Sequence, residues 1–359
     1  MAKSGQHGGN VLQMAEQYGL TPDSILDFSA NINPLGMPSS LKQAIINNLD
    51  LAEHYPDIDY RRLHDALACH IGCSPRSVLA GNGATELIFA LTHYLHPQKA
   101  MLPIPGFAEY RRALERGSCN IVDYTLHESD DYQPTEALLD ALTPDLDCLF
   151  LCTPNNPTGQ QPPLSLLLQI LDRCRALQIS LIVDESFIDF LPGQTGLTAY
   201  LNDYPNLYIL RSLTKFFAIP GLRLGYLLSA NEQAINAMRD QREPWTINAF
   251  AALAGETVLD DRVYIQQTHH WLATEQAYLY QALNEFKELH VWRPAANYIF
   301  IRNRQTGLQL QEELLRHHLL IRHCANYPGL SAHHYRIAIK SHAHNQQLVT
   351  ALKQVFGHG

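Results

Sequence analysis

The sequence predicts an α/β fold in which a large, mostly parallel, doubly wound sheet domain is followed by a smaller α+β domain. Short apolar segments alternate with helical segments over residues 77–228. Residues 146–152 form a nearly unbroken apolar run, as expected of a strand buried in a parallel sheet. From residue 290 the order becomes strand, helix, strand, strand, helix, which is typical of an α+β unit.

Length and composition agree with two unequal domains. The chain has 359 residues, of which 46% are hydrophobic, so it can bury a large core. We expect an N-terminal arm over residues 1–30 that packs with the small domain and the active site, a large domain over 31–245 and a small domain over 246–359.

Charge and hydropathy narrow the classes of partner. The formal net charge of −9 provides no basic surface for nucleic acid, although small anions remain possible ligands. The first ten residues lack the apolar core of a signal peptide, and no run approaches the roughly 20 apolar residues of a membrane span. We therefore expect a cytoplasmic protein without nucleic-acid or membrane partners.

The number and spacing of the cysteines predict reduced thiols and no metal site. They are odd in number and scattered, at positions 69, 73, 119, 148, 152, 174 and 324. Cys69, His70 and Cys73 form a short cluster, but no second ligand pair follows at zinc spacing.

Before Ser77 the sequence predicts mainly helices, over residues 11–18, 39–49 and 60–70. Residues 27–36 run extended into a turn, because Asn31, Asn33, Pro34 and Gly36 interrupt regular structure. The preceding His7-Gly8-Gly9 sequence is either a frayed tail or an arm that folds over a site.

In the rest of the chain, strands are expected over residues 78–82, 101–105, 119–126, 146–152, 181–185, 290–302, 319–324 and 335–340, with another beginning at 207. Helices are expected over residues 87–95, 135–142, 164–177, 234–241, 249–258, 308–317 and 345–356, with one opening near 106–110. A long helix over 264–289 has the length to bridge the two domains.

A glycine-rich turn at residues 81–86 is a candidate phosphate site. It brings free backbone N–H groups and the Thr85 hydroxyl to the start of a helix, where the helix dipole favours negative charge. The alternative is an ordinary strand-to-helix connection.

Lys215 is the candidate catalytic residue. It follows an apolar strand, with Ser212, Thr214 and Arg223 close by in the sequence. A lone lysine usually lies in a solvated loop, but this cluster provides an amine for a Schiff base and a guanidinium for an anion. The cluster therefore predicts a covalent aldehyde cofactor that carries a phosphate, namely pyridoxal phosphate.

Several other residues have two interpretations. Asp184 and Glu185 end an apolar strand, and a buried acid needs a partner, which can be a helix cap, an arginine or a cofactor cation. Phe107 is either part of the core or a stacking ring. Arg322 and Arg336 lie on predicted strands, where surface ion pairs are the default expectation.

These signals occur together in a fixed order. It runs Gly83-Ala84-Thr85, Asn156 before Pro-Thr-Gly, Asp184, Ser212-x-x-Lys215, then Arg223. Over its whole length the chain resembles the fold-type I pyridoxal-phosphate enzymes, specifically the aminotransferase class I/II branch that contains histidinol-phosphate aminotransferase.

The resemblance implies roles for the cofactor-binding residues. Lys215 carries the cofactor, Asn156 binds its ring hydroxyl oxygen, Asp184 pairs with its ring nitrogen and Phe107 stacks on the ring. The phosphate is held by Gly83, Ala84, Thr85, Ser212 and Arg223, and by Tyr55 from the neighbouring subunit of a homodimer with shared active sites.

The resemblance also implies a small phosphorylated amino-acid substrate. Arg336 then faces the substrate carboxylate and Arg322 its phosphate. The remaining substrate-binding residues are His7, Gly8, Asn31 and Asn156.

One departure from the aminotransferase pattern bears on the reaction. Where many relatives have Asp-Glu-Ala-Tyr, this sequence has Asp184-Glu185-Ser186-Phe187. Loss of the phenol removes one hydrogen bond to the ring oxygen of the cofactor and leaves Asn156 as its main protein partner, which weakens the interpretation as a transaminase. A histidinol-phosphate aminotransferase remains the alternative. A non-catalytic cofactor-binding regulator is disfavoured because no basic DNA-binding module is present.

Overall fold

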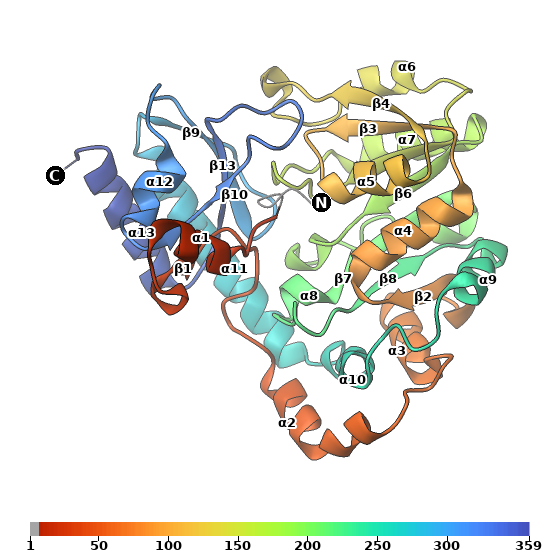
Figure 1. The fold of residues 1–359 in the computed structure, drawn as a ribbon. Coiled ribbons are helices and arrows are strands. Elements are labelled where there is room, and N and C mark those ends of the chain that lie inside the picture. The colour runs from red at the N-terminus through yellow and green to blue at the C-terminus, as the bar shows by residue number, and fades with distance from the viewer. Residues whose placement is uncertain (1–6, 359) are drawn as a thin grey trace.

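The computed structural model describes residues 7–358, and its main feature is a seven-stranded sheet (Figure 1). The strand order is β2-β8-β7-β6-β5-β3-β4, and β8 runs in the direction opposite to the other six strands. The strands are β2 (Val78–Gly81), β3 (Lys99–Ile104), β4 (Asn120–Thr125), β5 (Cys148–Cys152), β6 (Ser180–Asp184), β7 (Leu207–Ser212) and β8 (Gly225–Leu228). The predicted mostly parallel sheet is therefore confirmed.

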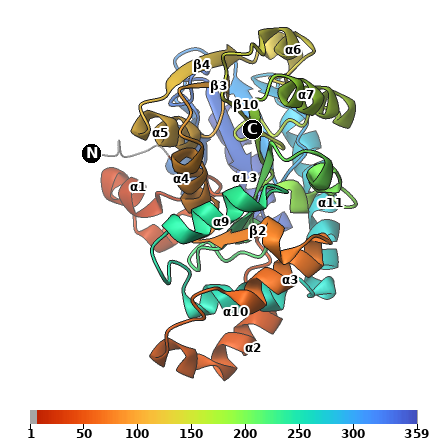
Figure 2. The same ribbon diagram turned by 90° about the vertical axis from the view of Figure 1, so that its right-hand side faces the viewer.

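Helices cover both faces of this sheet (Figure 2). Strand side chains such as Phe150 and Ile182 pack with one set of helices, α4 (Gly83–Leu95), α5 (Ala108–Arg116) and α9 (Glu232–Gln241). Their neighbours Leu151 and Val183 pack with the other set, α3 (Arg61–Ile71), α7 (Leu164–Ala176) and α10 (Ala249–Val258). Because successive strand side chains point to opposite faces, two cores form, as in a doubly wound fold.

The C-terminal part forms a second sheet with the antiparallel order β12-β13-β10-β9. Its strands are β9 (Leu289–Val291), β10 (Tyr298–Asn303), β12 (Arg322–His323) and β13 (His334–Ala338). The helices of this part are α11 (Arg262–Asn284), α12 (Leu310–Leu315) and α13 (His342–Val355). The long helix α11 runs between the two sheets in Figure 1.

The N-terminal segment packs on these C-terminal elements. Helix α1 (Val11–Tyr18) buries Met14 and Ala15 against Leu315 and Leu320. Strand β1 (Leu26–Asp27) pairs in parallel with β11 (Leu319–Leu320). Helix α10 instead contacts α2 (Ser39–Asn47) and α3. The exact domain boundaries stay a prediction.

Several predicted elements differ from the structure; the expected helix over 264–289, for example, ends at Asn284, and Leu289 belongs to β9. The expected strand over 290–302 is wrong: β9 and β10 are separate antiparallel strands, and Pro294, which has no N–H for a sheet ladder, lies between them. The expected strand over 319–324 is divided at Ile321, so that β11 and β12 join different sheets. Helix α4 begins at Gly83, so most of the predicted glycine-rich turn is already helical.

A buried ion pair joins the ends of β6 and β7 on the face opposite the candidate site. Arg211 donates from Nε to Glu185 Oε2 at 2.8 Å and from Nη1 to Asp189 Oδ1 at 3.1 Å. Glu185 also accepts from the Leu197 N–H at 2.8 Å. Glu185 is fully buried and Arg211 nearly so. This network fixes the two strand ends relative to the loop that follows β6.

Removing one partner of this pair is expected to destabilise the fold strongly. We expect Glu185→Ala to lower the free energy of unfolding by about 3–5 kcal/mol, because it leaves the Arg211 guanidinium buried without its main counter-charge. In the control Glu313→Ala, which removes the more exposed pair with Arg316, the loss is about 0–1 kcal/mol. Urea unfolding measures both, and equal losses would contradict the structural role of the pair.

Candidate active site

A cavity lies at the carboxyl ends of β5, β6 and β7, the edge where open α/β sheets bind ligands. Its lining contains nine of the ten residues predicted to bind a cofactor: Gly83, Ala84, Thr85, Phe107, Asn156, Asp184, Ser212, Lys215 and Arg223. The structure thus brings together residues that are far apart in the sequence.

Lys215 lies on the short helix α8 (Leu213–Phe216) that directly follows β7. Its Nζ donates to Ser212 Oγ at 3.0 Å and lies 5.5 Å from the centre of the Phe187 ring. Burial lowers the pKa of Lys215; Asp184 opposes this shift and Arg223 adds to it. A lowered pKa increases the neutral fraction of the amine, which is the form that attacks an aldehyde.

The two adjacent acids at the end of β6 have different partners. Asp184 accepts from the Tyr110 hydroxyl at 2.6 Å and from the Ser186 N–H at 2.9 Å. Glu185 points to the opposite face and takes Arg211. Glu185 therefore has the ordinary partner of a buried acid, whereas Asp184 faces the cavity and is available to a ligand cation.

Tyr110 was not identified from the sequence. It lies three residues after Phe107, at the spacing that puts side chains on the same side of a helix. Burial raises the pKa of Tyr110 well above its usual value, and Asp184 raises it further, so the phenol stays protonated and donates to Asp184.

The start of α4 forms a tight cradle for an anion. Gly83 has φ +77°, and a Cβ on it would lie 2.5 Å from Arg223 Nη2. A Cβ on Gly225 would lie 2.5 Å from the Ala84 nitrogen. The glycines therefore allow the Arg223 guanidinium and the N–H groups of the first helical turn to approach the same point.

The orientation of the Asn156 amide follows from its partners. Arg336 donates from Nη1 to Asn156 Oδ1, and the Tyr327 hydroxyl donates to the same oxygen at 3.4 Å. A guanidinium has no acceptor, so the amide oxygen must face Arg336. The Asn156 amide NH₂ is then available as a donor to a ligand in the cavity.

Arg322 and Arg336 are direct cross-strand partners on β12 and β13. Their exposed fractions are 5% and 6%. Arg322 donates to Asn326 Oδ1 at 2.9 Å and lies 5.6 Å from the Tyr327 ring centre, while Arg336 donates to the Ser29 carbonyl at 2.8 Å. Like charges directly opposite each other are destabilising, so this arrangement favours an anionic ligand. The default expectation of surface pairs is wrong for both residues.

The predicted substrate residues near the N-terminus also lie close to the site. His7 places its ring 5.9 Å from Phe107 and pairs through Nε2 with Glu109 Oε1 at 2.9 Å. Within the described range, Asn31 Oδ1 is buried without a hydrogen-bond partner. The Asn33 N–H donates to the Lys215 carbonyl at 3.1 Å, which places this segment beside α8.

Tyr55 does not join the cavity in this chain. It is 80% exposed and contacts Trp245, with the two rings tilted and their centres 4.6 Å apart. Its predicted role in a neighbouring subunit's site stays a prediction.

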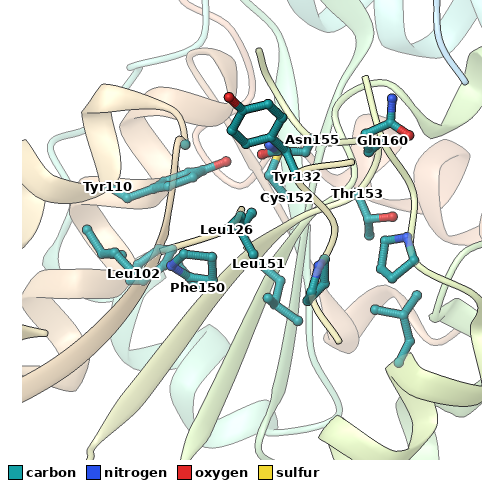
Figure 3. A pocket seen from close by; sticks show the side chains of 15 residues that line it. Leu102, Tyr110, Leu126, Tyr132, Phe150, Leu151, Cys152, Thr153, Asn155 and Gln160 are labelled. Atoms are coloured by element: carbon teal, nitrogen blue, oxygen red, sulfur yellow. The ribbon is translucent and has the colours of Figure 1, made fainter. Parts of the chain in front are cut away.

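A second, mainly apolar cavity lies next to the first (Figure 3). Tyr110 and Cys152 line both cavities. Burial raises the pKa of Cys152 to about 12, so its thiol stays protonated. These two side chains therefore form a neutral wall behind Asp184.

Within residues 7–358, no cluster of three or more His, Cys, Asp or Glu side chains is placed to hold a metal ion. All seven cysteines lie in this range and none forms a disulfide. Over the same residues, no helix is long and apolar enough to cross a membrane.

Comparisons with known proteins agree with this geometry. Residues 23–352 match the family model for aminotransferase class I and II. The chain is 54% identical to threonine-phosphate decarboxylase of Salmonella typhimurium, and the match covers 97% of this chain and 96% of the relative.

Two solved structures are similar to this chain over nearly its whole length. The histidinol-phosphate aminotransferase from Clostridium acetobutylicum superposes with a TM-score of 0.88 at 30% identity, over 93% of this chain and all of that one. The histidinol-phosphate aminotransferase from Sinorhizobium meliloti, solved in complex with pyridoxal-5'-phosphate, gives a TM-score of 0.84 at 20% identity over 98% and 97%. The latter supports the fold alone.

The close approach of Arg223 to Gly83 leads to a prediction about substitution of this glycine. Gly83→Ala and Gly36→Ala both place a Cβ at a positive φ, a strain of about 1–2 kcal/mol. Only at Gly83 does the new Cβ also meet a neighbour, Arg223, since nothing lies within 4 Å at Gly36. We therefore expect a larger loss of unfolding free energy for Gly83→Ala, as measured in urea. Equal losses would contradict the close approach of Arg223.

Proposed function

The chain belongs to the aminotransferase class I and II family, and from that premise we propose that it is a pyridoxal-phosphate-dependent decarboxylase. Its proposed substrate is L-threonine O-3-phosphate, and its products are (R)-1-amino-2-propanol O-2-phosphate and carbon dioxide, a step of cobalamin biosynthesis. The similarity to the Salmonella decarboxylase supports the reaction. The observation that carries the substrate is the in-register pair Arg322 and Arg336, because two guanidinium groups side by side suit a substrate with two anionic groups.

The donor set of the cavity fits pyridoxal phosphate. The cradle of Gly83, Gly225 and Arg223 suits its phosphate, and the Lys215 amine suits its aldehyde. Asp184, which is 4% exposed, suits the protonated ring nitrogen. When bound, this cofactor provides a carbonyl that bonds to amines and a pyridinium that accepts an electron pair. We propose that Thr85, Ser212, Phe107 and Asn156 complete its site.

The remaining chemistry is assigned to the residues of this chain. Asp184, fixed by Tyr110 and the Ser186 N–H, keeps the proton on the ring nitrogen. Lys215 Nζ provides the proton that Cα receives after the bond between Cα and the carboxylate carbon breaks and carbon dioxide leaves. Ser212 Oγ, 3.0 Å from Nζ, holds the amine close to the reacting carbon.

Orientation of the substrate decides which bond at Cα breaks. We assign Arg336 to the substrate carboxylate; its contact with Asn156, a residue that lines the cofactor cavity, supports this assignment. Arg322 takes the phosphate, with His7, Gly8 and Asn31 completing the pocket. Two planar guanidinium groups fix two anions and therefore the rotation about Cα.

Phe187 supports decarboxylation over transamination. Its ring is buried, packs edge-on against Tyr298 at 4.9 Å and lies beside Lys215 Nζ. At this position it has no hydroxyl to donate to the ring oxygen of the cofactor, which leaves the Asn156 amide as the donor.

The proposed assembly is a homodimer in which Tyr55 reaches the phosphate site of the other subunit. Its 80% exposure in the single chain leaves it accessible to a partner. We also propose the expected division into an arm over residues 1–30, a large domain over 31–245 and a small domain over 246–359.

Product analysis tests the reaction. With added pyridoxal phosphate, we expect the protein to release carbon dioxide from L-threonine O-3-phosphate and to form the phosphorylated amino alcohol. Lys215→Ala is expected to lower this rate by about 10³-fold, because it removes the amine that transfers the proton. Amino transfer between histidinol phosphate and 2-oxoglutarate, without carbon dioxide release, would instead identify a histidinol-phosphate aminotransferase.

Steady-state kinetics test the phosphate anchor. Arg322→Ala is expected to raise KM for L-threonine O-3-phosphate by about 30-fold or more, since loss of one buried charged contact costs about 2 kcal/mol or more. The control Arg316→Ala, at an exposed arginine, leaves KM unchanged. An unchanged KM in Arg322→Ala would refute this assignment.

A further inference from the structure

Residues 7–10 are held against the segment that carries Ser29. The Gly9 N–H donates to Ser29 Oγ at 2.8 Å. A Cβ on Gly8 would overlap the Ser29 carbonyl oxygen, the same atom that accepts a hydrogen bond from Arg336. The N-terminal residues therefore pack directly on the backbone that supports the proposed carboxylate anchor.

The preceding residue reaches across to helix α5, which covers the seven-stranded sheet. His7 Nε2 lies 2.9 Å from Glu109 Oε1. Glu109 is only 4% exposed, and its other charged partner, Arg112, is 3.4 Å away on a largely exposed side chain. A buried carboxylate is costly without a close partner, and His7 is the nearer of these two groups.

This contact also orients the imidazole. Glu109 as a carboxylate can only accept, so Nε2 must carry the hydrogen. The second ring nitrogen, Nδ1, is then the one that remains for a ligand. The ring lies 5.9 Å from Phe107, which lines the cofactor cavity, so His7 lies close to that cavity. When both ring nitrogens carry a hydrogen, Nε2–H donates to Glu109 and Nδ1–H can donate to an anion.

We propose that Glu109 is a positioning residue for phosphate recognition: it holds His7 so that the imidazole donates from Nδ1 to the substrate phosphate. This inference rests on the proposed function, since it needs a phosphorylated substrate. It assigns a purpose to a buried acid that contacts neither cofactor nor substrate. It also explains why residues 7–10 pack between Ser29 and α5, because that path brings the histidine to the carboxylate.

Equilibrium binding tests the proposal. In a Lys215→Ala background, which prevents turnover, calorimetry gives Kd for L-threonine O-3-phosphate and for L-threonine with pyridoxal phosphate present. We expect Glu109→Ala and His7→Ala each to weaken binding of the phosphorylated ligand about 10-fold and to leave L-threonine binding unchanged. The double variant is expected to match the single variants, because both remove the same contact. Glu109→Gln, which keeps an acceptor for Nε2–H without the charge, is expected to restore part of the affinity.

The control is Glu115→Ala, an exposed acid on the same helix, which leaves both Kd values unchanged. Equal weakening of both ligands, or additive effects of His7→Ala and Glu109→Ala, would overturn the proposal, because each indicates a structural role or independent action. If Glu109→Ala does not fold, the nearly isosteric Glu109→Gln provides the same comparison. Failure of the protein with Lys215 intact to release carbon dioxide from the phosphorylated substrate would refute the proposed function instead, and the Kd ratio would still decide the role of Glu109.

Discussion

The structure around the site depends on the buried contact between Arg211 and Glu185. This contact forms because neighbouring side chains of a strand point to opposite faces of the sheet. At the ends of β6 and β7 this places Glu185 and Arg211 on one face, where they neutralise each other. Asp184 and Ser212 are thereby placed on the other face, beside Lys215. The ion pair on one face fixes the strand ends, and the residues proposed to carry the chemistry lie on the other face.

The residues around Lys215 were predictable because their signals are local. A lysine after a buried strand, glycines before a helix and an acid at a strand end each have a physical meaning in the sequence. The parallel sheet then brings these ends to one edge, as the order of alternating strands and helices implies. The prediction failed where the chain bends within an apolar run, as at Pro294, since apolar periodicity does not show where a strand leaves its sheet.

The partners of these residues were not predictable in the same way. Tyr110 lies 74 residues from Asp184, and Glu109 lies 102 residues from His7, so no spacing in the sequence marks either contact. The sequence showed that Arg322 and Arg336 are charges on predicted strands. It did not show that they lie directly opposite each other, because this depends on the register of the β12–β13 pairing. Contacts of this kind determine which groups are neutral, which are charged and which remain available to a ligand.

The two halves of the site use charge differently. Around Lys215 the acid Asp184 and the cation Arg223 have opposite effects on the amine, so the local charges partly balance. Around Arg322 and Arg336 the charges have the same sign and lie in register, and the polar groups beside them act mainly as acceptors, including Asn156 Oδ1 and the Ser29 carbonyl. Two cations in register suit a ligand with two negative groups at a fixed spacing, which is the basis on which we propose that these arginines select the substrate.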